Sequence, residues 1–258
     1  MAEERIPASL DLTDFDAVLF DLDGVLTDTA SLHAQAWKSM FDEFLERWSV
    51  EHGHPFVAFR IDPDYLSYVD GKPRVEGVAS FLESRRIVLP DGTPDDPADA
   101  DTIHGLGRRK NELVLRLIEE AGVTVFPGSV RFVQRVLAAG LRAGVVSSSR
   151  NAGRVLRAGR IDHLFEDRVD GIVAAELGLP GKPAPDTFLE AARRMGVDPS
   201  RAIVVEDAIV GVEAGRVGGF GYVIGVDREG EPDRLAAHGA DVVVSDLDEL
   251  VPDGTRRG

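Results

Sequence analysis

The chain has 258 residues, of which 43% are hydrophobic and 29% charged, so it can bury a core in one large or two modest domains. With 29 basic and 45 acidic residues its net charge is −16, which argues against a protein that binds nucleic acid or anionic lipid. The absence of cysteine excludes disulfides and thiolate metal sites. No apolar run approaches the roughly 20 residues that span a bilayer, and the N-terminus lacks a signal-peptide pattern. We expect a cytoplasmic monomer whose partners are small molecules.

Short apolar runs typical of β-strands recur along much of the chain, and helical patterns separate the later ones. The runs lie at 17–20, 143–146, 202–205, 221–224 and 241–244, and the helical patterns at 130–139, 184–194 and 208–217. Strands that are apolar over their whole length and alternate with helices are typical of a parallel sheet covered on both faces. The sequence therefore predicts a doubly wound α/β core.

The interval from residue 30 to residue 126 has a helical character instead. Apolar residues recur at helical spacing from Ala30 to Trp48 and again from Asn111 to Ala121, with no convincing strand between them. The stretch 89–101 (LPDGTPDDPADAD) is rich in Pro, Asp and Gly, which indicates an exposed loop. We expect two domains: an α/β catalytic core of residues 1–29 and 127–258, and an inserted α-helical cap of residues 30–126.

The motif FDLDGVLTDT carries the strongest chemical signal. The first apolar strand delivers Asp21 at its carboxyl end, where open parallel sheets bind their ligands. Asp23 follows two residues later, and Gly24 permits a tight turn that aims both acids at one point. Asp and Gly are also ordinary residues at the end of a strand. This motif alone therefore leaves open whether the two acids are catalytic or only end the strand.

Later strand ends favour the catalytic reading. The second strand runs into a hydroxyl-rich turn that begins at Ser147 and suits phosphate oxygens. Lys182 precedes a helix that begins with proline, and another strand ends in Glu206 and Asp207, whose oxygens suit a hard cation. Each feature alone is commonplace, but four in order make coincidence an unlikely explanation.

This set of motifs resembles the haloacid dehalogenase superfamily over nearly the whole chain. The resemblance implies that Asp21 is the nucleophile that accepts a phosphoryl group and that Asp23 is the general acid and base. The dehalogenases of the superfamily lack that second acid, so its presence favours phosphoryl transfer. The resemblance also implies Mg²⁺ as cofactor, held by Asp21, the backbone carbonyl of Asp23, and Asp207, with Glu206 in support; Lys182 anchors nucleophile and phosphate.

Within the superfamily the chain looks closest to the β-phosphoglucomutase subfamily. The residues that carry this closer resemblance, and that it implies bind phosphate or substrate, are His33, Trp37, Gly71, Arg74 and Lys110 in the cap and Ser147, Ser149, Arg150, Asn151 and Lys182 in the core. A mutase must hold a second, distal phosphate, and a planar guanidinium suits two phosphate oxygens. Taken singly, each cap residue has a plainer explanation: a solvated arginine or lysine, a surface histidine, a core tryptophan.

The function implied is the interconversion of β-D-glucose 1-phosphate and glucose 6-phosphate through an aspartyl-phosphate and a 1,6-bisphosphate. A Mg²⁺-dependent sugar-phosphate phosphatase built from the same parts remains the alternative. The cap segments 49–70 and 89–101 are longer than the subfamily pattern requires, which bears on the sugar more than on the chemistry. A phosphoryl-receiver module is disfavoured, because it needs neither the second acid nor a cap, and no G-x-G-x-x-G motif indicates a dinucleotide site.

Overall fold

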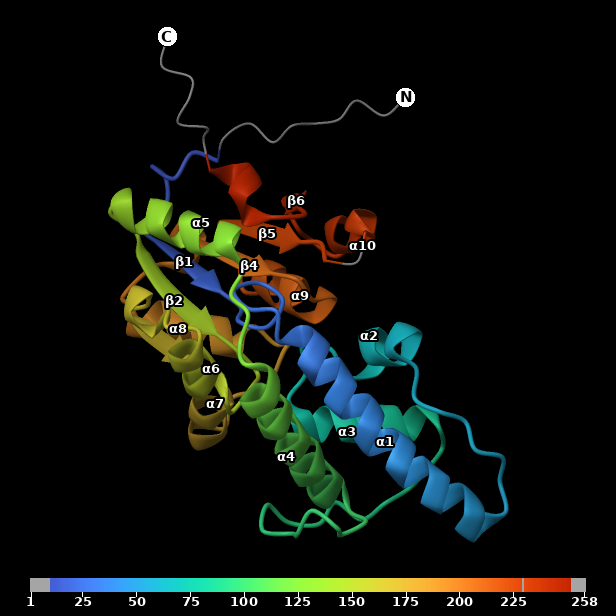
Figure 1. The fold of residues 1–258 in the computed structure, drawn as a ribbon. Coiled ribbons are helices and arrows are strands. Elements are labelled where there is room, and N and C mark those ends of the chain that lie inside the picture. The colour runs from blue at the N-terminus through green and yellow to red at the C-terminus, as the bar shows by residue number, and fades with distance from the viewer. Residues whose placement is uncertain (1–9, 229, 252–258) are drawn as a thin grey trace. The chain divides into compact units, whose positions relative to one another are not determined.

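The computed structural model describes residues 10–228 and 230–251. The chain divides into two compact units (Figure 1). One, here called the core unit, contains the residues up to Asp28 and those from Thr124 onward; the other, the cap unit, is Thr29–Val123. The boundaries expected from the sequence, after residue 29 and before residue 127, lie close to these.

The described part of the core unit contains one six-stranded parallel sheet in the order β3-β2-β1-β4-β5-β6. Its strands are β1 (Ala17–Phe20), β2 (Arg142–Val146), β3 (Asp167–Val169), β4 (Ala202–Glu206), β5 (Tyr222–Val226) and β6 (Val242–Val244). The parallel sheet and five of its strands are as predicted. The edge strand β3 was not predicted, because its three residues Asp-Arg-Val form no apolar run.

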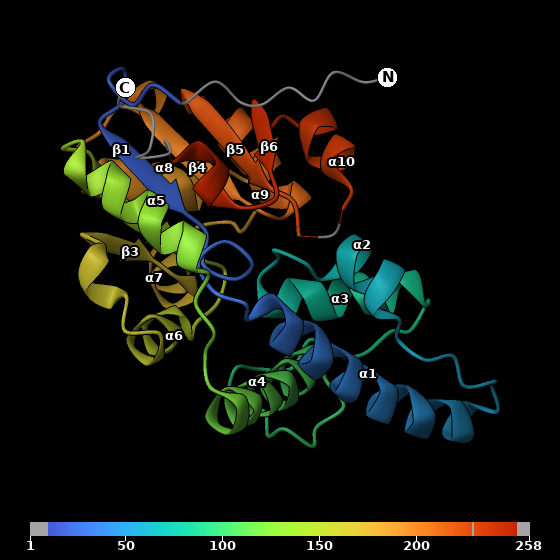
Figure 2. The same cartoon turned by 45° about the horizontal axis from the view of Figure 1, so that its top comes forward.

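Helices cover both faces of this sheet, which confirms the doubly wound prediction (Figure 2). Phe20 packs edge to face on Phe132 of α5 (Pro127–Ala138), with ring centroids 6.1 Å apart. The preceding residue, Leu19, belongs instead to the apolar cluster of Phe188 on α8 (Asp186–Arg194). Since successive strand residues point to opposite faces, α5 and α8 lie on opposite sides of the sheet. The remaining helices of the core unit are α6 (Ala152–Ala158), η2 (Asp162–Leu164), α7 (Gly171–Leu177), η3 (Pro199–Arg201), α9 (Ile209–Val217), α10 (Pro232–Ala237) and η4 (Leu247–Leu250).

Where the chain leaves the core unit and where it returns, the two segments are hydrogen-bonded to each other. The amide of Asp28 donates to the carbonyl of Thr124 at 2.9 Å, and the amide of Phe126 donates to the carbonyl of Leu26 at 3.0 Å. Thr27 lies between these bonds, in an antiparallel bridge with Val125. The two segments therefore form a small ladder, which includes the second half of the motif that carries Asp21 and Asp23.

The cap unit is helical over its described residues, with no strand among them. Its helices are α1 (Ala30–His52), η1 (Ile61–Tyr65), α2 (Leu66–Tyr68), α3 (Arg74–Ser84) and α4 (Ile103–Ala121). Helix α1 runs beyond the predicted end at Trp48 until Gly53, whose φ of 66° ends it in a left-handed conformation. Helix α4 begins before the predicted Asn111, because the hydroxyl of Thr102 caps it by accepting from the amide of Gly105 at 2.9 Å.

Aromatic side chains form the centre of the cap unit. The ring of Phe41 lies 5.3 Å from that of Trp37, 5.2 Å from Phe59 and 4.1 Å from Phe81, between ring centroids. Phe81 belongs to α3, which the sequence analysis did not predict. Burying each of these rings contributes about 1.5–3 kcal/mol to the stability of the cap unit.

The segment 89–101 forms neither helix nor strand, as predicted. It is nevertheless ordered by its own side chains: the carboxylate of Asp96 accepts from the hydroxyls of Thr93 at 2.9 Å and Thr102 at 2.6 Å. None of the helices in the described ranges combines the length and apolar character that crossing a membrane requires.

Candidate active site

The carboxyl ends of three neighbouring strands bring the predicted core residues to one edge of the sheet. Phe20 of β1 is in register with Val145 of β2 and with Val205 of β4. Asp21 and Glu206 therefore lie next to each other, one residue beyond this register. Parallel sheets bind ligands at this edge because the strand ends there are followed by loops that can carry functional groups.

Lys182 joins the two acids. Its ammonium nitrogen donates to Oδ1 of Asp21 at 2.5 Å and to Oε1 of Glu206 at 2.5 Å. The side chain is only 2% exposed, and its nitrogen lies 4.9 Å from the ring centroid of Phe188. The structure thus brings together three residues that are 161 and 24 positions apart along the chain.

Burial controls the electrostatics of this trio. It raises the pKa of Asp21 to about 6 and that of Glu206 to about 7, against the opposing influence of the lysine. Burial by itself would lower the pKa of Lys182, but the two carboxylates hold that pKa above its ordinary value. Because one ammonium faces two carboxylates, the electrostatics of the site favour the binding of a further cation.

The acids offer oxygen ligands for a cation. Asp21, Glu206 and Asp207 each present a carboxylate oxygen, all within 4.8 Å of one another. Both oxygens of Glu206 are engaged, however: Oε1 accepts from Lys182, and Oε2 accepts from the amides of Asp207 and Ala208 at 3.0 Å each. Asp21 and Asp207 therefore fit a hard divalent ion such as Mg²⁺, while Glu206 orients the lysine beside them.

Two glycines make this arrangement sterically possible. Gly24 has a φ of +87°, and a Cβ there would lie 1.7 Å from Oδ2 of Asp207. At Gly211 a Cβ would lie 1.8 Å from Oε1 of Glu206. The sequence analysis singled out Gly24 for its turn but missed Gly211, whose signal was its place five residues after Glu206 in the motif EDAIVG. Any larger residue at either position would displace a carboxylate.

The serine turn after β2 is held by its own hydroxyl groups. Ser147 is buried, and its hydroxyl accepts from the amide of Ser149 at 3.1 Å. The hydroxyl of Ser149 in turn accepts from the amide of Asn151 at 3.1 Å. Accepting these bonds leaves each hydroxyl proton able to donate to an anion. Arg150 lies exposed in this turn, and Asn151 is half-buried just before α6.

In the cap unit, three predicted residues meet. The ammonium of Lys110 lies 3.0 Å from Nδ1 of His33 and 4.8 Å from the ring centroid of Trp37. Lys110 is buried, 5% exposed, although the run RRK indicated a solvated patch. Burial, with the charges of Lys110 and Arg74, holds the pKa of His33 well below its ordinary value, so the imidazole is neutral. Trp37 is part of the aromatic core and supports the lysine.

Arg74 is the first residue of α3 and lies against α4. Its Nη1 donates to Oδ1 of Asn111 at 2.6 Å. One turn earlier on α4, Arg74 also lies against Gly107, where a Cβ would be in ordinary van der Waals contact with Nε at 3.5 Å. Asn111 and Gly107 were not singled out from the sequence. Gly71, with a φ of +66°, lies in the turn before α3.

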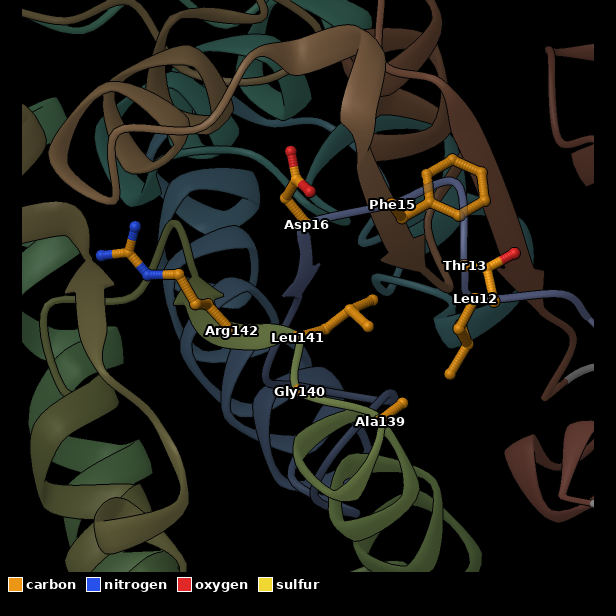
Figure 3. Close-up of a pocket in the computed structure, with 8 residues that line it drawn as sticks. All are labelled: Leu12, Thr13, Phe15, Asp16, Ala139, Gly140, Leu141 and Arg142. Atoms are coloured by element: carbon orange, nitrogen blue, oxygen red, sulfur yellow. The ribbon is translucent and has the colours of Figure 1, made fainter.

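A cavity of about 480 Å³ lies elsewhere in the core unit (Figure 3). Its lining residues are Leu12, Thr13, Phe15, Asp16, Ala139, Gly140, Leu141 and Arg142. These precede β1 and β2, so the cavity is at the opposite edge of the sheet from Asp21. It contains none of the predicted site residues.

Comparison with known proteins identifies the family of the chain. The family model of haloacid dehalogenase-like hydrolases matches residues 15–219. A β-phosphoglucomutase of Mycobacterium bovis is 52% identical over 238 residues, 91% of each chain, and one of Bacillus subtilis is 30% identical over 91% of each. A crystal structure of β-phosphoglucomutase from Clostridium difficile superposes with a TM-score of 0.70 at 26% identity, covering 92% of this chain and 93% of that one. The chain is an enzyme of the haloacid dehalogenase-like hydrolase family, and β-phosphoglucomutases are among its relatives there.

Proposed function

We propose that the enzyme interconverts β-D-glucose 1-phosphate and glucose 6-phosphate through an aspartyl-phosphate and the 1,6-bisphosphate. The observation that carries the proposal is the buried trio of Asp21, Lys182 and Glu206 at the strand edge, in a chain 52% identical to a β-phosphoglucomutase. The substrate is a sugar phosphate, and we place the enzyme in the cytoplasm as a monomer.

In the first step, a carboxylate oxygen of Asp21 forms a bond to phosphorus while the bond from phosphorus to the departing sugar oxygen breaks. Asp23 supplies the proton that this oxygen needs. In the return step Asp23 takes the proton of the accepting sugar hydroxyl, whose oxygen attacks the aspartyl-phosphate and regenerates Asp21. Atoms and protons balance over the cycle, because each proton given by Asp23 is recovered.

The charges around Asp21 are what allow a dianionic phosphate to approach a carboxylate. Lys182 is held against Asp21 at 2.5 Å, and the hydroxyls of Ser147 and Ser149 can donate to phosphate oxygens. Mg²⁺, held by Asp21, Asp207 and the carbonyl of Asp23, would neutralise further negative charge on the transferring group. Without these groups the repulsion between phosphate and Asp21 would block the attack.

We assign the second phosphate of the bisphosphate to Arg74, with Arg150 and Asn151 as further donors. Arg74 presents a guanidinium whose position is set by Asn111, and such a fork suits two phosphate oxygens. His33, Trp37, Gly71 and Lys110 form the remainder of the proposed sugar-phosphate contacts of the cap.

The experiment is incubation with β-D-glucose 1-phosphate and a trace of the β-1,6-bisphosphate, while glucose 6-phosphate and free phosphate are measured together. A mutase forms glucose 6-phosphate with little release of phosphate, and the α-anomer serves as the control substrate. Stoichiometric phosphate without glucose 6-phosphate would instead favour a sugar-phosphate phosphatase. That alternative has some support, since a trehalose-phosphate phosphatase of Mycobacterium leprae is 37% identical over 139 residues, 52% of this chain.

A further inference from the structure

Arg228, in the loop after β5, reaches the turn that carries Asp23. Its Nε donates to the carbonyl of Gly24 at 2.8 Å, and its Nη1 donates to the carbonyl of Ser245 at 2.8 Å. The sequence analysis had no reason to single it out, because 204 positions separate it from Gly24. Arg228 thus contacts the backbone of the catalytic motif from a distant loop, as Ser129 of α5 does from a helix by donating to the carbonyl of Val25 at 2.6 Å.

The guanidinium is itself held in place. It lies over the ring of Phe126, 3.8 Å from the centroid, and Phe126 belongs to the ladder described above. Burial lowers the pKa of Arg228, and the negative charges of Asp246, Asp207 and Asp28 partly offset this effect. The preceding residue, Asp227, anchors the loop, since its Oδ1 accepts from the amide of Gly230 at 2.9 Å. An arginine that is stacked on a ring and bonded to two carbonyls has little freedom to move.

Arg228 completes the bonding of Gly24. The amide of Gly24 already donates to the carbonyl of Thr27 at 2.8 Å, and its carbonyl accepts from Arg228. These two bonds fix the peptide planes on both sides of Gly24. The peptide plane between Asp23 and Gly24 contains the carbonyl of Asp23, so the direction of that carbonyl is fixed as well. Gly24 needs such restraint because a glycine at φ +87° has no side chain to limit its rotation.

We infer that Arg228 is a positioning residue, which holds the Asp23–Gly24 turn in the orientation that proton transfer to and from the sugar oxygen requires. The inference rests on the proposed function for the role of Asp23. It predicts a selective defect. A poor leaving group such as a sugar oxygen needs the proton of Asp23, whereas p-nitrophenolate leaves without one.

The first test is hydrogen exchange of the whole enzyme, which needs no substrate. In Arg228→Gln we expect the amides of residues 22–27 to exchange about tenfold faster, because a charge-assisted bond is lost, with β1 and β4 unchanged. Arg216→Gln is the matched control: Arg216 also donates to a backbone carbonyl, that of Gly239, at 2.7 Å, and to Asp241 at 2.6 Å. Unaltered exchange of residues 22–27 in Arg228→Gln would overturn the inference.

The second test compares two substrates. For Arg228→Gln, kcat on β-D-glucose 1-phosphate should fall about tenfold or more. The kcat/KM on p-nitrophenyl phosphate, which covers only the steps up to release of p-nitrophenolate, should fall by less than about threefold, with Arg228→Lys between mutant and wild type. Equal losses on both substrates would mean a merely structural role and would also overturn the inference. If the wild type forms no glucose 6-phosphate while the exchange effect is present, the proposed function fails and the positioning role of Arg228 is supported.

Discussion

Replacing Lys182 by methionine should destabilise the core unit strongly. The ammonium of Lys182 makes two bonds of 2.5 Å to carboxylates, and a hydrogen bond to a charged group contributes about 1.5–3 kcal/mol. Removing one partner of a buried ion pair typically costs about 3–5 kcal/mol of stability, because an uncompensated charge is left behind. Here two carboxylates are left, Asp21 at 7% and Glu206 at 0% exposure. We therefore expect a loss of about 3–5 kcal/mol in the free energy of unfolding.

Urea unfolding followed by circular dichroism measures this loss. Tryptophan fluorescence is the wrong probe, since Trp37 and Trp48 are the chain's two tryptophans and both belong to the cap unit. The matched control is Arg201→Met, which breaks an ion pair with Asp16 whose partners are 49% and 46% exposed; water screens this pair, so its loss should cost far less stability. If both variants lose the same small amount of unfolding free energy, Lys182 does not compensate the buried charges of Asp21 and Glu206 in the way described above.

A double variant separates charge from packing. Adding Glu206→Gln to Lys182→Met removes one of the two stranded carboxylates, so part of the lost stability should return. Phosphorylation of Asp21 should not return, because the approaching phosphate still lacks the lysine. Recovery of both stability and phosphoenzyme, detected by incorporation of labelled phosphate, would contradict the role given to Lys182.

Three further outcomes are expected. Gly24→Ala should abolish turnover while circular dichroism stays native, because its Cβ would lie 1.7 Å from Oδ2 of Asp207; retained kcat would refute the steric argument. Arg74→Ala should reduce formation of glucose 6-phosphate far more than hydrolysis of p-nitrophenyl phosphate, and parallel losses would count against a distal phosphate site. His33 has a depressed pKa, so it contributes stability above an unfolded pKa of about 6.5 that is lost as pH falls below it. His33→Gln should therefore flatten the fall in stability between about pH 7 and pH 5, measured by urea unfolding, and an unchanged slope would show that His33 is not its source.

Part of the candidate site, at the carboxyl ends of the strands, could be predicted from the sequence. Asp21, Ser147 and Glu206 could be predicted to lie near one another because apolar runs locate strand ends, and strand ends in a parallel sheet share an edge. The contact of Lys182 with Asp21 was expected only from the family resemblance, and its second bond, to Glu206, was not predicted, because it depends on where the segment that carries the lysine packs after the sheet has formed. Arg228 illustrates the limit: nothing in the loop VDRE indicates that its side chain contacts Gly24.

The cap unit was harder to predict for a related reason. Helix α3 contains Gly77 and a short apolar pattern, so its helical signal is weak in isolation; it is held by Phe81 in the aromatic cluster. Lys110 indicated a solvated charge, yet the ring of Trp37 and the imidazole of His33 let it be buried. Tertiary partners of this kind leave no periodic trace in a sequence.

The ladder of Leu26–Asp28 with Thr124–Phe126 has an evolutionary consequence. Since the outgoing and returning strands of the chain are bonded side by side, the inserted helices begin and end at neighbouring points. Such an insert can be exchanged for another of different length without shifting either splice point. New specificities can thus be acquired by replacing the whole cap unit while the core unit stays unaltered. Chimaeras joined at these residues are therefore a practical route to engineered sugar preferences.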